Sequence, residues 1–421
     1  MNSSQTTPVP RAVAVWSLVG LVLLTVNLRA AITGISPVLG ELQEQFGLSG
    51  AEVGILTTLP VLCLGVFAAV APAAARLAGT ETAIAGSLVM ITAGIVLRVV
   101  ESPVSLFVGT VLAGAGIALG NVLLPAVIKR AFPSRVGSLT GLAMMLMAAS
   151  GAVAAGLAVP LDEAGGWRLA LAVWAVPSLV AALVWGPLAV KRRRAPAAPA
   201  APVTAPHAGG SLLRSAVAWY VAAFMGLVSL MFYVLMSWLP EIMRDAGYPP
   251  AAAGMMVSTM MIVGIPLGFL VPVFAARLGD QRPLVVAVVA VMVAGLGGLL
   301  LVPSAGWVWV AVLGVGTGSA FPLAYTLLSL RSPSPSAAAR LSGMAQTGGY
   351  LLAATGPLAV GVLHEATGGW NVPLVLLLVL VVPELAVGLL AARPGFVRTS
   401  GPRAPLVEPK ELTAAEPARA R

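Results

Sequence analysis

The sequence predicts an all-α integral membrane protein whose twelve transmembrane helices form two pseudo-symmetric six-helix bundles. Composition, the spacing of apolar runs and an internal repeat together predict this fold. Of the 421 residues, 59% are apolar and 9% charged, whereas soluble domains are about 45–50% apolar and about 25% charged. A span needs about 20 apolar residues, so the chain has enough for about twelve spans. Too little remains for a large catalytic domain outside the membrane.

Twelve apolar runs, separated by charges, prolines and glycines, give the order of the spans. A stretch that begins Lys-Arg-Arg-Arg and continues with alanines and prolines divides them six and six, and it is expected to be a cytoplasmic linker because it cannot pack a core. The first six runs are 12–40, 51–76, 81–100, 103–130, 136–160 and 167–190, and the second six are 214–243, 251–277, 283–302, 305–330, 337–363 and 370–392. The expected domains are therefore an N-terminal cytoplasmic segment (1–11), an N-terminal bundle (12–190), a linker (191–213), a C-terminal bundle (214–392) and a disordered cytoplasmic tail (393–421).

The basic residues indicate which ends of the spans are cytoplasmic. The formal net charge is +9, and only Arg98, Arg168 and Arg244 fall on the side opposite the termini, while Arg29 lies inside a span. Cytoplasmic loops of membrane proteins carry an excess of Lys and Arg. We therefore expect a multi-pass plasma-membrane protein with both termini cytoplasmic. Because this bias accounts for the basic excess, no nucleic-acid partner is expected.

An internal repeat relates the two halves. Ala51-Glu-Val-Gly54 is answered by Ala251-Ala-Ala-Gly254, and Gly165-Gly-Trp167 by Gly368-Gly-Trp370, at offsets between 200 and 203. Parallel six-helix halves of this kind are an architecture of secondary transporters, in which the substrate site lies near the midplane between the halves.

Arg29 is the sharpest functional candidate because it lies deep in the first apolar run. A charge there costs at least about 2.5–3.5 kcal/mol on insertion scales. If the run is one helix, Thr25, Thr33 and Ser36 share its face, which predicts a polar stripe lining water. The guanidinium offers a fork of donors suited to a planar or linear anion. The alternative is a structural arginine bound by backbone carbonyls of broken neighbouring helices.

Other polar and aromatic side chains predict the remaining walls of a small-molecule site. Asn27, about 160° round the helix from Arg29, is expected to hydrogen-bond a neighbouring helix instead. Asn121 lies in the fourth span, and the sequence is compatible with two roles for it: lining the cavity or contacting a neighbouring helix. The other candidates lie at helical spacing in the seventh, tenth and eleventh spans, where plain packing is the alternative for each: Tyr233, Phe321, Tyr325, Gln346 and Tyr350.

Carboxylates are scarce within the spans. Glu384 is the acidic residue placed well inside one, and none accompanies Arg29. A cavity with one permanent positive charge favours an anionic or strongly dipolar substrate. Glu384 is a possible proton-coupling group, and the alternative is a protonated or snorkelling carboxylate. No metal site and no cofactor are expected.

Four short strings of residues stand out in the spans: Asn27-Leu-Arg29, Gly120-Asn121-Val-Leu-Leu-Pro125, Phe321-Pro322 and Leu341-Ser-Gly-Met-Ala-Gln346 with Gly349-Tyr350. Together they resemble the cyanate permease and nitroimidazole transporter branch of the major facilitator superfamily. The resemblance implies the major facilitator fold, and it implies that the arginine of the first string contacts substrate. The loop Ala71 to Gly79 keeps only Arg76 and a glycine of the pattern usual after the second span of that superfamily.

The function expected from these observations is secondary active transport of a small anionic or polar solute, cyanate-like or a small organic anion, by alternating access. The first alternative is efflux of small planar drug-like compounds such as nitroimidazoles, and the second is a membrane sensor or receptor without transport. An enzyme is not expected, and the sequence has no phosphate-cradling Gly-x-x-x-x-Gly-Lys loop. The expected partners are the solute and the lipid bilayer, with a coupling proton as a further candidate, and the chain is expected to act as a monomer.

Overall fold

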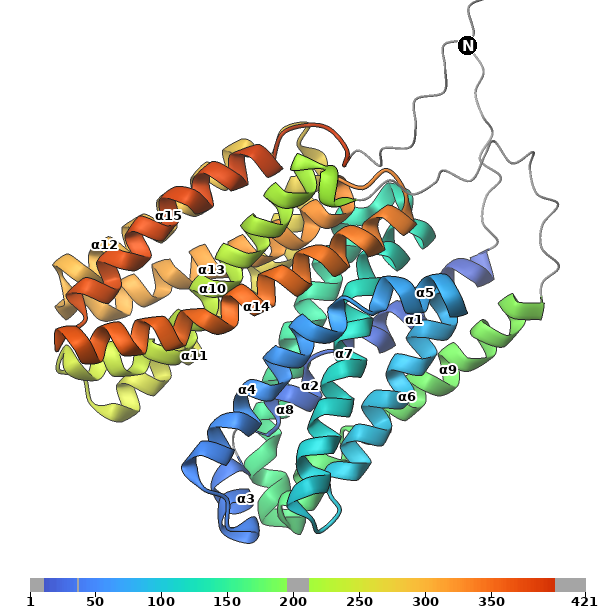
Figure 1. Ribbon diagram of the computed structural model, residues 1–421, viewed down its shortest axis with the longest axis horizontal. Helices are drawn as coiled ribbons and strands as arrows, with labels where there is room; N and C mark the ends of the chain where they lie inside the picture. Colours follow the sequence, from blue (N-terminus) through green and yellow to red (C-terminus); the bar gives the residue numbers. More distant parts are fainter. Residues whose placement is uncertain (1–10, 36–37, 195–211, 398–421) are drawn as a thin grey trace, which may run out of the picture.

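A computed structural model describes residues 11–35, 38–194 and 212–397, and this part of the chain is helical apart from turns (Figure 1). Nearly all of the expected N-terminal segment, the central part of the linker and nearly all of the tail lie outside the described residues. The first bundle comprises α1 (Arg11–Asn27), α2 (Ala30–Thr33), α3 (Leu39–Phe46), α4 (Gly50–Ala68), α5 (Ala71–Ala78), α6 (Thr80–Arg98), α7 (Pro103–Ala131), α8 (Val136–Ala172) and α9 (Ala175–Arg194). The second comprises α10 (Ala216–Asp245), α11 (Pro250–Arg277), α12 (Arg282–Leu301), α13 (Gly306–Leu330), α14 (Pro335–Thr367) and α15 (Asn371–Ala391).

The helices account for the twelve expected crossings. Ten segments of the described chain are long and apolar enough to span a membrane, and the bent pair α4 and α5 makes an eleventh. The twelfth is α14, which is less apolar than the others, and its polar residues Ser342, Gln346 and Tyr350 are buried against other helices. A helix covered by protein needs less apolar surface than one that faces lipid. The expected fold of two six-helix bundles is confirmed.

Breaks interrupt three of the spans. The first span is not the single helix expected, because α1 ends at Asn27 and α2 begins at Ala30. Helices α4 and α5 meet at a bend of 51°. The sixth expected span, 167–190, is divided between α8, which ends at Ala172, and α9, which begins at Ala175. The kink of α8 at Gly166, where φ is +73°, separates the fifth expected span from the sixth, and this left-handed conformation favours glycine.

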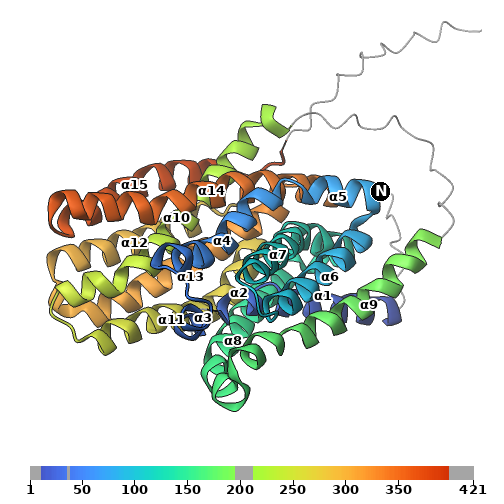
Figure 2. The ribbon, with the colours of Figure 1, turned by 60° about the horizontal axis from the view of Figure 1, so that its bottom comes forward.

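The two bundles form a V (Figure 1). At one end, which we call the closed end, α8 packs on α11, and the start of α14 packs on α4 and α5 (Figure 2). Glycines permit this approach: a Cβ on Gly141 would lie 2.6 Å from the carbonyl oxygen of Phe269, and one on Gly343 would lie 2.7 Å from Cγ of Pro72. The ends of the segment left out between the bundles emerge on this side, and the bundles diverge on the opposite side.

The repeat is visible in side-chain contacts at the closed end. Arg130, near the end of α7, forms an ion pair with Glu81 at the start of α6. At the corresponding position of the second bundle, Arg331 donates hydrogen bonds to Gln281 and to the carbonyls that end α15. Each bundle therefore fixes this end with a buried or half-buried arginine, paired to a carboxylate in one half and to an amide in the other.

Candidate functional site

Arg29 lies at the break of the first span. It is the residue before α2, with φ −134° and ψ −36°, and its side chain is half-buried. Thr33, one turn later, donates its hydroxyl to the carbonyl of Gly151 on α8 at 3.0 Å. A Cβ on Gly151 would lie 3.1 Å from Cγ of Arg29, so the absent side chain makes room for the arginine stem. The break replaces the polar helical stripe expected around Arg29, because Thr25 is fully buried and donates to backbone carbonyls of α1.

Two tyrosines of the second bundle lie within electrostatic range of Arg29. The guanidinium is close enough to interact electrostatically with the hydroxyls of Tyr233 on α10 and Tyr350 on α14. Tyr350 interacts in turn with Tyr325 on α13. Tyr325 and Tyr350 are buried, whereas Tyr233 is half-buried. A positive charge of one bundle thus lies within electrostatic range of hydroxyl groups of the other.

Asn121 on α7 connects the bundles beside these tyrosines. Its backbone carbonyl accepts a hydrogen bond from the Tyr325 hydroxyl at 2.6 Å and a longer one from Nε2 of Gln346 at 3.4 Å. Nε2 of Gln346 also donates to Ser342 at 2.6 Å. The side-chain oxygens Oδ1 of Asn121 and Oε1 of Gln346 are buried, and they have no hydrogen-bond partner among the described residues. Leaving such a group unpaired costs about 1–3 kcal/mol, and a bound solute or water would offset this cost.

Aromatic rings lie among the polar groups of the candidate site. Phe321 and Tyr325 lie with ring centroids 6.1 Å apart, and Phe232 packs edge-on against Tyr233 at 5.4 Å. Apolar rings with a few convergent polar groups are the usual lining of a small-molecule site. The structure therefore gathers most sequence-predicted site residues near one point where the bundles meet.

Glu384 lies apart from this group. Its helix, α15, packs on α10, α12 and α14 of its own bundle. The side chain is 1% exposed, and its Oε2 has no hydrogen-bond partner among the described residues. The carboxyl is therefore held inside the second bundle, so it does not snorkel to the membrane surface.

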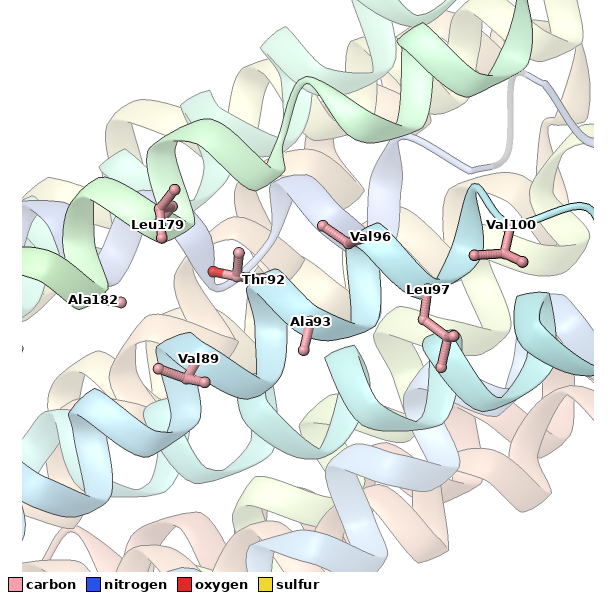
Figure 3. Close-up of a pocket in the computed structure, with 8 residues that line it drawn as sticks. All are labelled: Val89, Thr92, Ala93, Val96, Leu97, Val100, Leu179 and Ala182. Carbon is pink, nitrogen blue, oxygen red and sulfur yellow. The ribbon is translucent and has the colours of Figure 1, made fainter.

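One pocket is separate from the candidate site (Figure 3). It lies between α6 and α9, and its lining is apolar except for the hydroxyl of Thr92, which is hydrogen-bonded to Ser178 at 2.8 Å. Arg29 does not line it. A groove of this composition suits lipid chains better than a polar solute.

Two other polar residues, Asn27 and Arg98, allow the positions expected from the sequence to be compared with the structure. Asn27 donates to the carbonyl of Pro177 on α9 at 3.2 Å, which confirms the expected contact with a neighbouring helix. Arg98, expected on the side opposite the termini, is 1% exposed inside the first bundle. Its place within the apolar run 81–100 was the available signal for burial. No group of three or more His, Cys, Asp or Glu suited to a metal ion occurs in the described part of the chain.

Comparisons with known proteins agree on one family. Residues 21–357 match the family model described as Major Facilitator Superfamily. The chain is 39% identical to the uncharacterized transporter YycB of Bacillus subtilis (strain 168), over 91% of this chain and 94% of that protein. It is 38% identical to the 2-nitroimidazole transporter of Escherichia coli (strain K12), over 90% of this chain and 96% of that protein. It is 28% identical to the cyanate transport protein CynX of the same organism, over 84% and 91%.

Solved structures share the fold at low sequence identity. The proton:xylose symporter XylE superposes with a TM-score of 0.72 at 13% identity, covering 91% of this chain and 95% of that one. FucP in its outward conformation superposes with a TM-score of 0.71 at 13% identity, covering 90% and 100%.

Proposed function

This chain belongs to the major facilitator superfamily of membrane transporters, and on that premise we propose that it carries a small anionic or polar solute by alternating access. The resemblance found in the sequence is confirmed, and the family consists of transporters rather than enzymes. The observation that carries the proposal is the position of Arg29 between a break in its own bundle and the tyrosines of the other.

The preference for an anion follows from charge. No carboxylate of the described residues forms an ion pair with Arg29. A permanent cation without a counter-charge attracts anions, and the planar guanidinium fork matches a carboxylate or another planar anion. Tyr233 and Tyr350 supply hydroxyl donors on the opposite side. Thr33, Asn121, Phe321, Tyr325 and Gln346 complete the proposed set of substrate contacts.

A second candidate function is efflux of uncharged planar compounds. The aromatic pair Phe321 and Tyr325 favours it, because rings stack on planar ligands. The relative that is a 2-nitroimidazole transporter also favours it. A sensor without transport is the third candidate, and it is separated from the first two by the absence of solute flux.

Uptake into proteoliposomes tests these candidates. Cyanate, benzoate and uncharged 2-nitroimidazole are each offered with and without an imposed pH gradient. We expect flux of the anions, and failure to move any anion would overturn the first candidate. Flux of 2-nitroimidazole alone supports the second candidate. If Glu384 couples a proton, the pH gradient drives flux in the original protein and no longer does so in Glu384→Gln.

Orientation is proposed from the basic residues. The closed end carries Lys129, Arg130 and Arg277, so the positive-inside rule makes it cytoplasmic, in a plasma membrane, and the described conformation outward-facing. The test replaces Cys63, the single cysteine, and introduces one cysteine at Leu77 or at Ala164, both exposed. An impermeant thiol reagent is expected to label position 164 from outside and position 77 only from the cytoplasmic side. The reverse pattern would discard the orientation.

A further inference from the structure

Arg98 is a fully buried arginine at the end of α6. Its Nε donates to the Thr110 hydroxyl on α7 at 3.1 Å, and its Nη1 donates to the backbone carbonyl of Ala31 on α2 at 2.5 Å. Nη2 has no hydrogen-bond partner among the described residues. The buried Cys63 is close enough to interact with it electrostatically. A buried guanidinium with so few acceptors is expensive, so its position calls for a reason beyond packing.

The acceptor of Arg98 is the backbone of the broken span, two residues after Arg29. In a regular helix the amide of Ile35 would donate to the carbonyl of Ala31. Here that amide donates to the carbonyl of Ile32 instead, at 3.5 Å. The carbonyl of Arg29 accepts from the amides of both Ile32 and Thr33. Arg98 therefore takes the place of a backbone donor at the distorted turn that carries Arg29.

Close helix packing fixes Arg98 itself. A Cβ on Gly109 of α7 would lie 2.8 Å from the backbone nitrogen of Arg98 and 3.0 Å from its Cγ. A Cβ on Gly94 of α6 would lie 2.5 Å from the backbone nitrogen of Ala113. These glycines bring α6 and α7 together, so the arginine projects from a rigid helix pair toward α2.

We propose that Arg98 is a positioning residue, which holds the turn after the break and so presents the Arg29 guanidinium to Tyr233 and Tyr350. The role rests on the proposed function of Arg29. It does not require Arg98 to touch the solute, because its partners are Thr110 and the backbone of Ala31.

Hydrogen exchange of purified protein tests the structural half of this proposal without any solute. In Arg98→Met, we expect the amides of residues 32–35 to exchange at least about tenfold faster, while the rest of the first bundle changes less. Thr110→Val keeps the bond to Ala31 and is expected to leave these amides unchanged. The matched control is Arg331→Met, which removes a buried arginine that also donates to backbone carbonyls, but in the other bundle. If Arg98→Met does not fold, Arg98→Lys is measured, and a several-fold rise confined to residues 32–35 is expected.

Binding affinity tests the functional half of the proposal, which is that Arg98 positions Arg29 for the solute. The probe is whichever of cyanate, benzoate and 2-nitroimidazole the original protein binds, and we expect at least about tenfold weaker binding in Arg98→Met with no change in Arg331→Met. Unchanged exchange at residues 32–35, a uniform rise across the bundle, or faster exchange with unchanged affinity would each overturn the proposal. If the original protein binds none of the probes, the proposed function fails, while the exchange result still decides whether Arg98 holds the turn.

Discussion

The hydroxyl of Tyr325 in the second bundle donates a 2.6 Å hydrogen bond to the backbone carbonyl of Asn121 in the first. Both residues are buried, and each belongs to the candidate substrate contacts. The bond crosses between bodies that must move apart when the closed end opens. If the proposed substrate contacts are right, this pair of residues links solute binding to the conformation of the transporter.

Tyr325→Phe removes this bond and keeps the ring. A neutral hydrogen bond contributes about 0.5–1.5 kcal/mol, so the closed arrangement should lose roughly 2- to 10-fold in population. Nitroxide labels at the exposed positions Leu77 and Leu278, one on each bundle, report the separation by pulsed electron spin resonance. In Tyr325→Phe, we expect a larger share of long distances between the two labels than in the original protein. An unchanged distance distribution would contradict the link.

Lys129→Met tests a second contact between the bundles. Nζ of Lys129, near the end of α7, donates to the carbonyl of Ser329 at 2.8 Å, where α13 ends. A cation at a helix C-terminus typically contributes about 0.3–1 kcal/mol. We expect the same spin-label pair to show partial opening, with the melting temperature little changed. Arg244→Met, which removes an exposed cation elsewhere in the second bundle, is the control and should leave the distances as they are.

Two glycine substitutions separate conformational change from stability. In Gly141→Ala the new Cβ meets the carbonyl oxygen of Phe269 across the bundles, so closure is obstructed while each bundle is intact. In Gly318→Ala the new Cβ would lie 2.3 Å from Cα of Gly264 within the second bundle. Overpacking costs about 1–3 kcal/mol. We expect long label distances with a normal melting temperature in the first variant, and a lower melting temperature with normal distances in the second. An identical response in both would contradict the assignment of Gly141 to the moving interface.

The sequence was sufficient to predict the bundle count, because apolar runs and the repeat report directly on burial in lipid. It also singled out Arg29 and the tyrosines, which stand out in apolar spans, and their role in binding stays a prediction. The break at Arg29 was missed because no proline or glycine marks it. The turn is bonded instead by Arg98, whose approach depends on close packing at Gly94 and Gly109. Such contacts between helices have no local signal in the sequence.

Stability should depend on pH through Glu41 of α3. Hydrogen bonding to Asp162, partial burial and the negative charges of Asp162 and Glu44 raise the pKa of Glu41 above its ordinary value of 4.5. The folded protein therefore binds this proton more tightly than the unfolded chain does. The contribution to stability is complete below the ordinary pKa and is lost as pH rises through the raised value.

We therefore expect the melting temperature to fall as pH rises above 4.5 and through the raised pKa of Glu41, with Glu41→Gln removing part of that fall. The control, Glu163→Gln, changes an exposed carboxylate nearby and should keep the original slope. A Glu41→Gln protein with the original pH dependence would contradict the assignment.

Arg29 is expected to supply the charge that makes the site select anions. Arg29→Lys keeps the charge but replaces the planar fork with a compact ammonium, so anion affinity should weaken by about 1–3 kcal/mol, or roughly 5- to 150-fold. Arg29→Ala should abolish specific binding with the bundles still folded. The matched control is Arg168→Ala, which removes an exposed arginine that pairs with Glu101 away from the bundle interface. An exposed ion pair contributes only about 0–1 kcal/mol to folding stability, so this variant should stay folded. We expect it to bind anions as the original protein does.

A structural arginine makes the opposite prediction. If Arg29 served only to satisfy the backbone at the break, both of its variants would melt at lower temperature, and the folded fraction would bind anions normally. Its position argues against this reading, because the guanidinium interacts electrostatically with Tyr233 and Tyr350 of the other bundle, whereas the turn is bonded by Arg98. Affinity and melting temperature measured on the same purified variants decide between the two roles. Unchanged affinity in Arg29→Ala would end the proposal that this residue binds the solute.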